Sequence, residues 1–305
     1  MIDRRQLGGA RGRQVWAGLA VCIGCAAPVA PEVRGDADST DGDPMPFSPF
    51  YLLPHAPPGF VAEEAPLPPP RPPLVLNHGR RELPKVALTF DACSSARRPG
   101  YDDRVAEILV ATGTKATIFM GGRWALAAPD AALHLAQTAG IEIANHGFEH
   151  KNLVGATEAE IRAEIAAAQD AIYSVTGVVP RLFRPPFALY DRRVAEVTGA
   201  LGLVVVQYDV ASGDPDQSFT PEVLTRWVVD SVQGGAIILM HINRRGWYTA
   251  DALPAIIGEL AARGFAFVTV SELLADLDAA SAGPSTCDEA EVDSAASQSL
   301  YSARP

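Results

Sequence analysis

The sequence has little positive charge for its length, and this limits the partners it can bind. Its 305 residues carry 25 Lys and Arg against 36 Asp and Glu, a formal net charge of -11. A nucleic-acid-binding protein needs a basic face that neutralises phosphates. No dense run of Lys or Arg follows the first residues, so we exclude nucleic acid as a partner. Apolar side chains are not scarce, since 48% of the residues are hydrophobic, enough for a sizeable core.

The N-terminal apolar stretch is short for a membrane span. It runs from Val15 to about Ala30, whereas a transmembrane helix needs roughly 20 apolar residues. Because it follows a positive segment that includes Arg4 and Arg5, we interpret residues 1–30 as an export signal, with a loose resemblance to the twin-arginine type. Ile23-Gly24-Cys25 resembles the end of a lipoprotein cleavage box. We therefore expect an exported protein of the periplasm or cell envelope, with membrane contact only through the signal or a lipid on Cys25.

Cysteine is scarce as well. Of four cysteines, Cys22 and Cys25 lie in or beside the signal, and Cys93 and Cys287 remain in the exported chain. An oxidising compartment permits a disulfide between those two, but the sequence leaves open whether they meet.

The organisation of the chain changes three times after the signal. Residues 31–83 are polar and then dense in proline, which favours extended polyproline II, so we predict a stiff linker. Residues 279–305 are rich in Ala and Ser with few large apolar side chains, and we predict a disordered tail. Between them, residues 84–278 alternate short apolar runs with amphipathic segments, and no internal repeat is apparent.

This alternation predicts seven strand-helix units in a parallel α/β fold. Several apolar runs are continuous, as in strands that are buried on both faces. The predicted strands are Val86–Phe90, Ala116–Met120, Ile141–Ala144, Leu182–Arg184, Leu203–Tyr208, Ala236–His241 and Phe267–Val270. The clearest helix runs from Thr157 to Val175, with a capping box of Thr157 and Glu160; others begin near Asp102, Pro129, Asp191, Thr220, Thr249 and Ser271. A nearly closed barrel and a doubly wound open sheet both fit this pattern.

Polar side chains follow five of the predicted strands at their carboxyl ends, where parallel barrels build their sites. They are Asp91, the pair His146 and His150, Arg184, the pair Asp209 and Asp214, and His241. His-x3-His spacing places two imidazoles on one face of a helical turn, which suits one divalent metal. Taken singly, each residue has a simpler interpretation: a surface histidine, a turn-forming aspartate, a surface ion pair or a buried core histidine. We leave Asp209 unassigned and favour a site because the strand ends converge.

The order of these motifs resembles the polysaccharide deacetylases of the NodB-homology type, carbohydrate esterase family 4, over about residues 85–277. The matching motifs are Thr89-Phe90-Asp91, His146-x3-His150, Arg184-Pro185-Pro186-Phe187, Ser212-Gly213-Asp214 and Leu239-Met240-His241. The resemblance implies a distorted (β/α)7 barrel, which decides between the two architectures above.

The resemblance also implies the role of each residue. Asp91 would be the general base that activates water, and Arg184 would orient it. His241 would be the acid that protonates the leaving amine, held by Asp214. His146 and His150 would bind a divalent metal, with zinc as the expected ion. Amide hydrolysis needs an activated water, a Lewis acid and a proton for nitrogen, and these groups supply all three. The expected partner is a carbohydrate polymer or oligomer that contains N-acetyl sugars.

One residue departs from the family pattern. The usual first motif is Thr-Phe-Asp-Asp-Gly, whose second Asp is the third metal ligand, but here Ala92 and Cys93 follow Asp91. Three replacements are open: Asp91 itself, a Cys93 thiolate, or Asp102 or its neighbour Asp103 folded back over the site by the stretch from Ser94 to Gly100. Family variants with Ala-Cys often carry a similar Gly-Tyr-Asp downstream, so we expect Asp102 to be the third ligand.

Two further functions stay open. Ala92 is compatible with a metal-poor pseudoenzyme or a carbohydrate-binding scaffold, although such a protein has no need of an acid-base pair. Pro215 stands where the family has Trp after the fourth motif, which suggests an altered acyl pocket and keeps open O-acetyl esters or a non-carbohydrate amide as substrate.

Overall fold

The computed structural model describes residues 64–93 and 100–281. The predicted export signal at residues 1–30, Cys25 as a predicted lipidation site, Cys287 and the predicted tail after residue 281 lie outside the described residues, as does most of the stretch from Ser94 to Gly100. None of the helices in the described part is long and apolar enough to cross a membrane.

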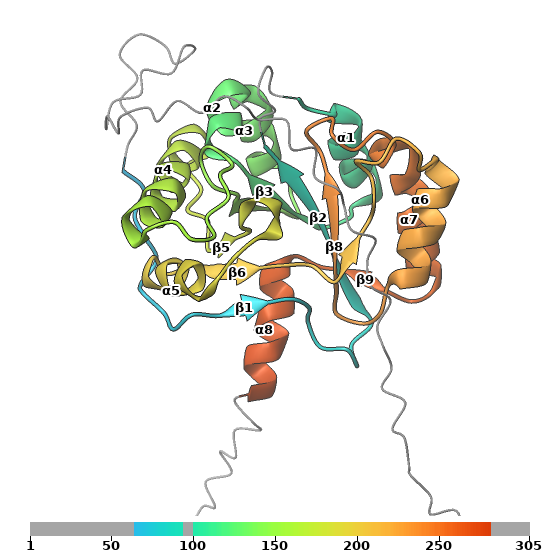
Figure 1. The fold of residues 1–305 in the computed structure, drawn as a ribbon. Helices are drawn as coiled ribbons and strands as arrows, with labels where there is room; N and C mark the ends of the chain where they lie inside the picture. Colours follow the sequence, from blue (N-terminus) through green and yellow to red (C-terminus); the bar gives the residue numbers. More distant parts are fainter. Residues whose placement is uncertain (1–63, 94–99, 282–305) are drawn as a thin grey trace, which may run out of the picture. The chain divides into compact units, whose positions relative to one another are not determined.

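The fold is built on a sheet of nine strands in which every pair is parallel (Figure 1). The strand order is β1-β6-β5-β4-β3-β2-β8-β7, and β9 also pairs with β2. The strands are β1 (Val75–Leu76), β2 (Lys85–Ala92), β3 (Ala116–Met120), β4 (Ile141–Asn145), β5 (Leu182–Phe183), β6 (Val204–Val206), β7 (Val210–Ala211), β8 (Ala236–His241) and β9 (Ala266–Phe267). The sheet curls into the distorted (β/α)7 barrel that the motifs predicted.

Most helices lie around the outer side of this sheet (Figure 1), whereas Val270 and Leu273 of the last helix pack in the core inside the curl. Helices α1, α6 and α7 pack together near β8, and α2, α3, α4 and α5 pack together near β4 and β5. The helices are α1 (Asp103–Thr112), α2 (Gly122–Ala127), α3 (Pro129–Gln137), α4 (Glu158–Thr176), α5 (Arg192–Ala200), α6 (Pro221–Ser231), α7 (Thr249–Ala262) and α8 (Val270–Ser281), with a short 3-10 turn η1 (Pro186–Ala188).

Strand β2 lies at the centre of the fold and has a buried side chain on each face. Val86, Leu88, Phe90 and Ala92 belong to the core between the sheet and the helices, whereas Ala87 belongs to the core inside the curl. This alternation follows from the two-residue period of a strand. It places Asp91 on the inner side, at the carboxyl end of a strand that β3 and β8 hold on both flanks.

The folded part begins earlier in the sequence than residue 84, where we predicted the start of the barrel. Val75 and Leu76 pair with β6, and Arg71 N donates to Gly199 O at 2.9 Å. A Cβ on Gly202 would lie 2.4 Å from Pro68 O, so the glycine allows the proline-rich segment to approach the end of α5. The described part of the predicted linker is therefore packed against the domain.

The last predicted strand, Phe267–Val270, differs from the structure. The strand ends at Phe267 and α8 begins at Val270. Thr269 N donates to Glu272 Oε2 at 2.8 Å, and Glu272 N donates to Thr269 Oγ1 at 3.3 Å. This reciprocal capping box starts the helix directly after the strand. By contrast, the helix predicted from Thr157 has its capping box as expected, and Gly177 ends it in the left-handed conformation.

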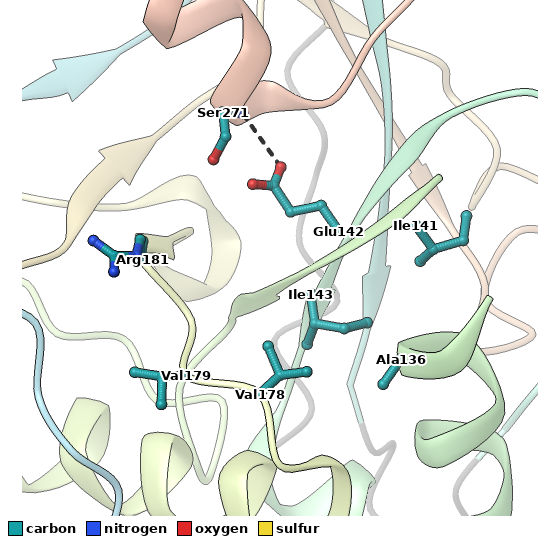
Figure 2. A pocket seen from close by; sticks show the side chains of 8 residues that line it. All are labelled: Ala136, Ile141, Glu142, Ile143, Val178, Val179, Arg181 and Ser271. Carbon is teal, nitrogen blue, oxygen red and sulfur yellow. Dashed lines mark hydrogen bonds between the residues drawn. The ribbon is translucent and has the colours of Figure 1, made fainter. Parts of the chain in front are cut away.

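A cavity of about 230 Å³ lies near the amino end of β4, away from the strand ends that carry the predicted site (Figure 2). Its lining includes Ile141, Val178, Arg181 and Ser271 and contains no histidine or cysteine. The Glu142 carboxylate accepts from Thr117 Oγ1 at 2.8 Å and from Ser271 N at 3.3 Å. Because these bonds anchor the start of α8, Glu142 has a structural role there.

Candidate active site

Four of the predicted site residues meet at the carboxyl ends of the central strands. Asp91 lies near the end of β2 and is in register with His241 at the end of β8. His146 follows β4 and Arg184 follows β5, and both side chains reach Asp91. Four positions that are far apart in the sequence are thus brought to one place by the parallel sheet.

Asp91 and Arg184 form a buried ion pair. Arg184 Nη1 donates to Asp91 Oδ1 at 2.8 Å and Nη2 donates to Gln207 O at 3.2 Å. The guanidinium lies 3.9 Å from the centre of the Phe119 ring, a favourable contact for a cation. The Arg184 side chain is 1% exposed and the Asp91 side chain is 8% exposed. Burial alone would raise the pKa of Asp91, but the surrounding positive charges, of which Arg184 is permanent, hold that pKa below its ordinary value.

His241 is held by a second buried carboxylate. Asp214 Oδ1 accepts from His241 Nδ1 at 2.8 Å, and Oδ2 accepts from the His241 backbone N at 2.7 Å. Thr249 Oγ1 and Ser212 Oγ also donate to this carboxylate, at 2.6 and 3.0 Å. Burial alone would lower the pKa of His241, but the Asp214 charge and hydrogen bond raise it above its ordinary value. Nδ1 therefore carries a proton, and Nε2 is the nitrogen free to exchange one with a substrate.

The loop after β4 presents His146 and His150, and it is not the helical turn that the spacing predicted. Gly147 and His150 have φ of 77° and 61°, in the left-handed region, and the chain is irregular from His146 to Asn152. Two buried anchors fix this loop: Gly147 N donates to Asn145 Oδ1 at 2.8 Å, and Glu149 N donates to Glu164 Oε1 at 2.6 Å. A compact loop therefore brings the imidazoles together, with ring centres 5.0 Å apart.

Both imidazoles are suited to bind a metal. His146 Nδ1 lies 2.9 Å from Arg184 O, and since a carbonyl can only accept, Nδ1 carries the hydrogen and Nε2 keeps its lone pair. Burial lowers the pKa of His146. Burial, followed by the neighbouring His146 charge, lowers the pKa of His150 to about 3. Both rings are thus neutral at physiological pH, the form that coordinates metal ions.

The third member of this group is Cys93, whereas the structure places Asp102, which we expected to be the third ligand, outside the group. Among the described residues, Cys93, His146 and His150 offer ligand atoms that all lie within 4.8 Å of one another. Asp102 stands at the N-cap of α1, and its two oxygens accept from Arg104 at 3.1 and 3.0 Å. The Asp102 carboxylate is therefore already paired with the Arg104 guanidinium, and Asp102 is not a member of the group. Burial, followed by the Asp91 charge, raises the pKa of the Cys93 thiol to about 11.

Two residues of the loop after β8 contribute to the site without having been predicted. Asn243 Nδ2 donates to Cys93 O at 2.8 Å and to Cys93 Sγ at 3.1 Å. The positive charge of Arg245 acts to lower the pKa of the Cys93, His150 and His241 side chains. The only signal in the sequence is that both follow His241 closely, at the end of a strand that already carries a site residue.

Comparisons with known proteins show which family this chain resembles. A sequence model of the family described as polysaccharide deacetylase matches residues 78–206. The peptidoglycan-N-acetylglucosamine deacetylase PgdA of Listeria monocytogenes is 30% identical over 190 residues, which cover 62% of this chain and 38% of that protein. The peptidoglycan-N-acetylmuramic acid deacetylase PdaA of Bacillus subtilis is 26% identical over 199 residues, 64% of this chain and 73% of that protein.

The solved structures include both active and inactive relatives. A pseudoenzyme of carbohydrate esterase family 4 from Bacillus anthracis superposes with a TM-score of 0.61 and 26% identity, covering 67% of this chain and 70% of that one. A mutant of the same protein has restored enzymatic activity. The family match, these relatives and the shared barrel give one conclusion: residues 78–206 match the polysaccharide deacetylase family, and the described domain has the fold of solved structures from carbohydrate esterase family 4.

Proposed function

We propose that this domain is a metal-assisted hydrolase that removes acetyl groups from N-acetylated sugars, with Asp91 as base and His241 as acid. The observation that carries the proposal is the presence of two separate buried pairs, Asp91 with Arg184 and His241 with Asp214, on neighbouring strand ends. A protein that only bound a sugar would have no use for a carboxylate poised to accept a proton beside an imidazole poised to donate one.

Asp91 has the properties of a general base. Its Oδ1 is held by Arg184, so Oδ2 is the oxygen available to a water molecule. The lowered pKa keeps the carboxylate ionised at neutral pH. Arg184 fixes the direction in which Asp91 points, because its second nitrogen is anchored to Gln207 O and its plane lies over Phe119. A base held in this way loses little entropy as the reaction proceeds.

His241 has the complementary properties. Asp214 holds Nδ1 and stabilises the imidazolium, so Nε2 donates a proton to the leaving nitrogen. The expulsion of an amine requires such a proton. The raised pKa favours the charged form of this acid. The rate kcat/KM is therefore expected to fall as the pH drops through the lowered pKa of Asp91 and as it rises through the raised pKa of His241.

The donor set at the mouth of the site fits a divalent metal. His146 and His150 would hold it as neutral imidazoles, and the third ligand is treated below. When bound, the ion would polarise the acyl oxygen as a Lewis acid. Arg245 is exposed, and its positive charge acts on Cys93, His150 and His241.

We place the substrate in the cell envelope. The N-terminal segment of the chain carries the pattern of an export signal, and the two curated relatives named above act on peptidoglycan, as their names state. This chain spans 38% of the length of the Listeria protein, so its own polymer, and the choice between amide and ester, are matters for assay.

Release of acetate by the purified, zinc-loaded protein tests the proposal. Chitin oligomers, peptidoglycan and acetylxylan would be offered in parallel, and activity on at least one is expected. Asp91→Asn and His241→Ala should abolish it while metal stays bound. Asp216→Asn is the matched control, because this exposed carboxylate accepts hydrogen bonds only from its neighbour Ser218 among the described residues. If zinc binds and the wild type releases no acetate from any of these substrates, the proposal fails.

The second candidate is a pseudoenzyme, and the comparison with the Bacillus anthracis structure is the observation that favours it. In that case the domain would bind the sugar polymer without turning it over. The same assays separate the two, because a pseudoenzyme would pull down with the polymer while releasing no acetate, and Asp91→Asn would leave its binding unchanged.

A further inference from the structure

The end of strand β2 decides which side chain can complete the metal group. Ala92 is fully buried and packs with Val86, Leu88 and Phe90 in the core between the sheet and the helices. Asp91 and Cys93, one residue to either side of it, share the opposite face, as the alternation of an extended chain requires. Cys93 is therefore directed toward the same space as the base, and its sulfur lies within 4.8 Å of a ligand atom of His146 and of His150.

Two of the competing carboxylates, those of Asp102 and Asp91, are engaged elsewhere. Asp102 is held by Arg104 through both of its oxygens, and Arg104 also contacts Asp251 at 3.1 Å. Asp91 is held by Arg184, and its second oxygen is 3.4 Å from His146 Nε2. To serve as ligand, Asp102 would have to leave a two-point ion pair, and Asp91 would have to leave the geometry that suits it to act as base.

The Cys93 side chain is also held by a hydrogen bond from Asn243. Asn243 is 5% exposed and donates through Nδ2 to both the carbonyl and the sulfur of Cys93, while its Oδ1 accepts from Arg245 N at 3.2 Å. A hydrogen-bond donor aimed at a sulfur stabilises the thiolate over the thiol and fixes its direction, as the groups behind other metal ligands do. A cysteine that only filled space in an apolar core would not need such a hydrogen-bond donor.

We propose that Cys93 binds the metal as a thiolate, so that the metal centre of this enzyme consists of one cysteine and two histidines in place of the carboxylate-containing site of its family. Binding breaks the S–H bond, forms the sulfur–metal bond and releases one proton to solvent. A soft thiolate with two imidazoles suits zinc and cobalt, whereas magnesium and manganese prefer oxygen ligands. Three protein ligands leave the fourth position of a tetrahedral zinc site to substrate or water. This proposal rests on the proposed function in one respect only: both assign His146 and His150 to the metal.

Cobalt spectroscopy of the full chain tests this proposal without any activity measurement. A thiolate bound to Co²⁺ gives an intense charge-transfer absorption in the near ultraviolet, which a carboxylate does not. We expect this band in the wild type, kept reduced by a phosphine, and its loss in Cys93→Ser and in His146→Ala. The histidine variant controls for the other cysteines of the chain, because a band that arose from them would survive it.

Zinc affinity supplies the second readout. Cys93→Ser should weaken zinc binding more than Asn243→Ala, for which the loss of a group that orients a ligand predicts about a 10- to 100-fold effect. Asp102→Asn should change neither the band nor the affinity. Wild-type protein that binds cobalt without the band overturns the proposal even if no variant folds, as does a Cys93→Ser protein that keeps the band. A normal band in a protein without deacetylase activity would refute the proposed function and leave this one standing.

Discussion

Removal of the Arg184 charge is the perturbation whose outcome follows most directly from the structure. Arg184→Met keeps much of the volume of the side chain and its contact with Phe119 but removes every hydrogen-bond donor. The Asp91 carboxylate, 8% exposed, then loses the only permanent positive charge that pairs with it among the described residues. Gln207 O loses a donor at the same time.

The loss in unfolding free energy can be bounded from this geometry. Removing one partner of a buried ion pair destabilises a protein by about 3–5 kcal/mol, because the other charge stays buried without compensation. That is a large part of the roughly 5–15 kcal/mol that holds a domain folded. In the wild type, the lowered pKa of Asp91 means that its pair stabilises the fold above the ordinary carboxyl range and stops doing so as the pH falls through the lowered pKa.

The pKa of Asp91 should move upward in the variant. Without Arg184, burial is opposed by fewer positive charges, so the carboxylate can escape the penalty more easily by taking up a proton. Arg184→Met should therefore be much less stable than the wild type at neutral pH, and the difference should shrink at mildly acidic pH. Asp91→Asn in the same chain should recover part of the loss, since it removes the uncompensated charge.

Urea unfolding followed by circular dichroism at the two pH values measures these differences, with a chelator present so that metal binding adds nothing. Arg192→Met is the matched control: its partner Glu196 is at i+4 on α5, and the two side chains are 90% and 46% exposed. An exposed helix pair is worth about 0.3–0.5 kcal/mol. An Arg184→Met penalty as small as that of the control, or one that does not change with pH, would refute the argument that Asp91 depends on a buried counter-charge.

Two further outcomes are expected. Arg245→Gln removes a charge that acts to lower the pKa of His241, so the alkaline limb of the kcat/KM profile should move to higher pH. Arg244→Gln is the control, because the Nε of Arg244 is bonded to a backbone oxygen, and it should leave this limb in place. Equal shifts in both variants would contradict the assignment. Thr157→Ala removes the side chain that accepts from Glu160 N at 3.3 Å and should cost about 1 kcal/mol of unfolding free energy with unchanged activity; a loss of activity at full metal occupancy would show that α4 has a role beyond support.

Much of this molecule could be predicted from the sequence, because the strands that carry the site are continuous apolar runs with a polar residue at the end. The strands over 116–120 and 236–241 have the predicted bounds. A strand that is buried on both faces is apolar along its length, so the first polar residue after the run marks its end, and the parallel sheet brings those ends together. This reasoning found Asp91, Arg184 and His241, which lie together in the structure.

The remaining details depend on contacts that no local pattern encodes. The sequence left Asp102 and Cys93 open as third ligands, and our proposal of Cys93 depends in part on Arg104, which lies two residues after Asp102 and holds its carboxylate. The spacing of His146 and His150 fits a helical turn, but two buried anchors made it a loop. Strand β1 has two residues, too few for a periodic signal, and it forms because β6 offers it an open edge.

The position of β2 between β3 and β8 has a consequence for how such a site can change. The base is carried by the strand whose backbone amides are paired on both sides, and we expect those amides to be among the slowest in the domain to exchange with deuterium. The side chains that we propose as metal ligands are carried by the chain that follows the strands. The proposed base is therefore tied to the stability of the whole domain, whereas we expect the proposed metal ligands to vary at smaller cost. A lineage can accordingly replace a carboxylate by a thiolate, or adopt a different metal, while the barrel and its proton-transfer pair stay as they are.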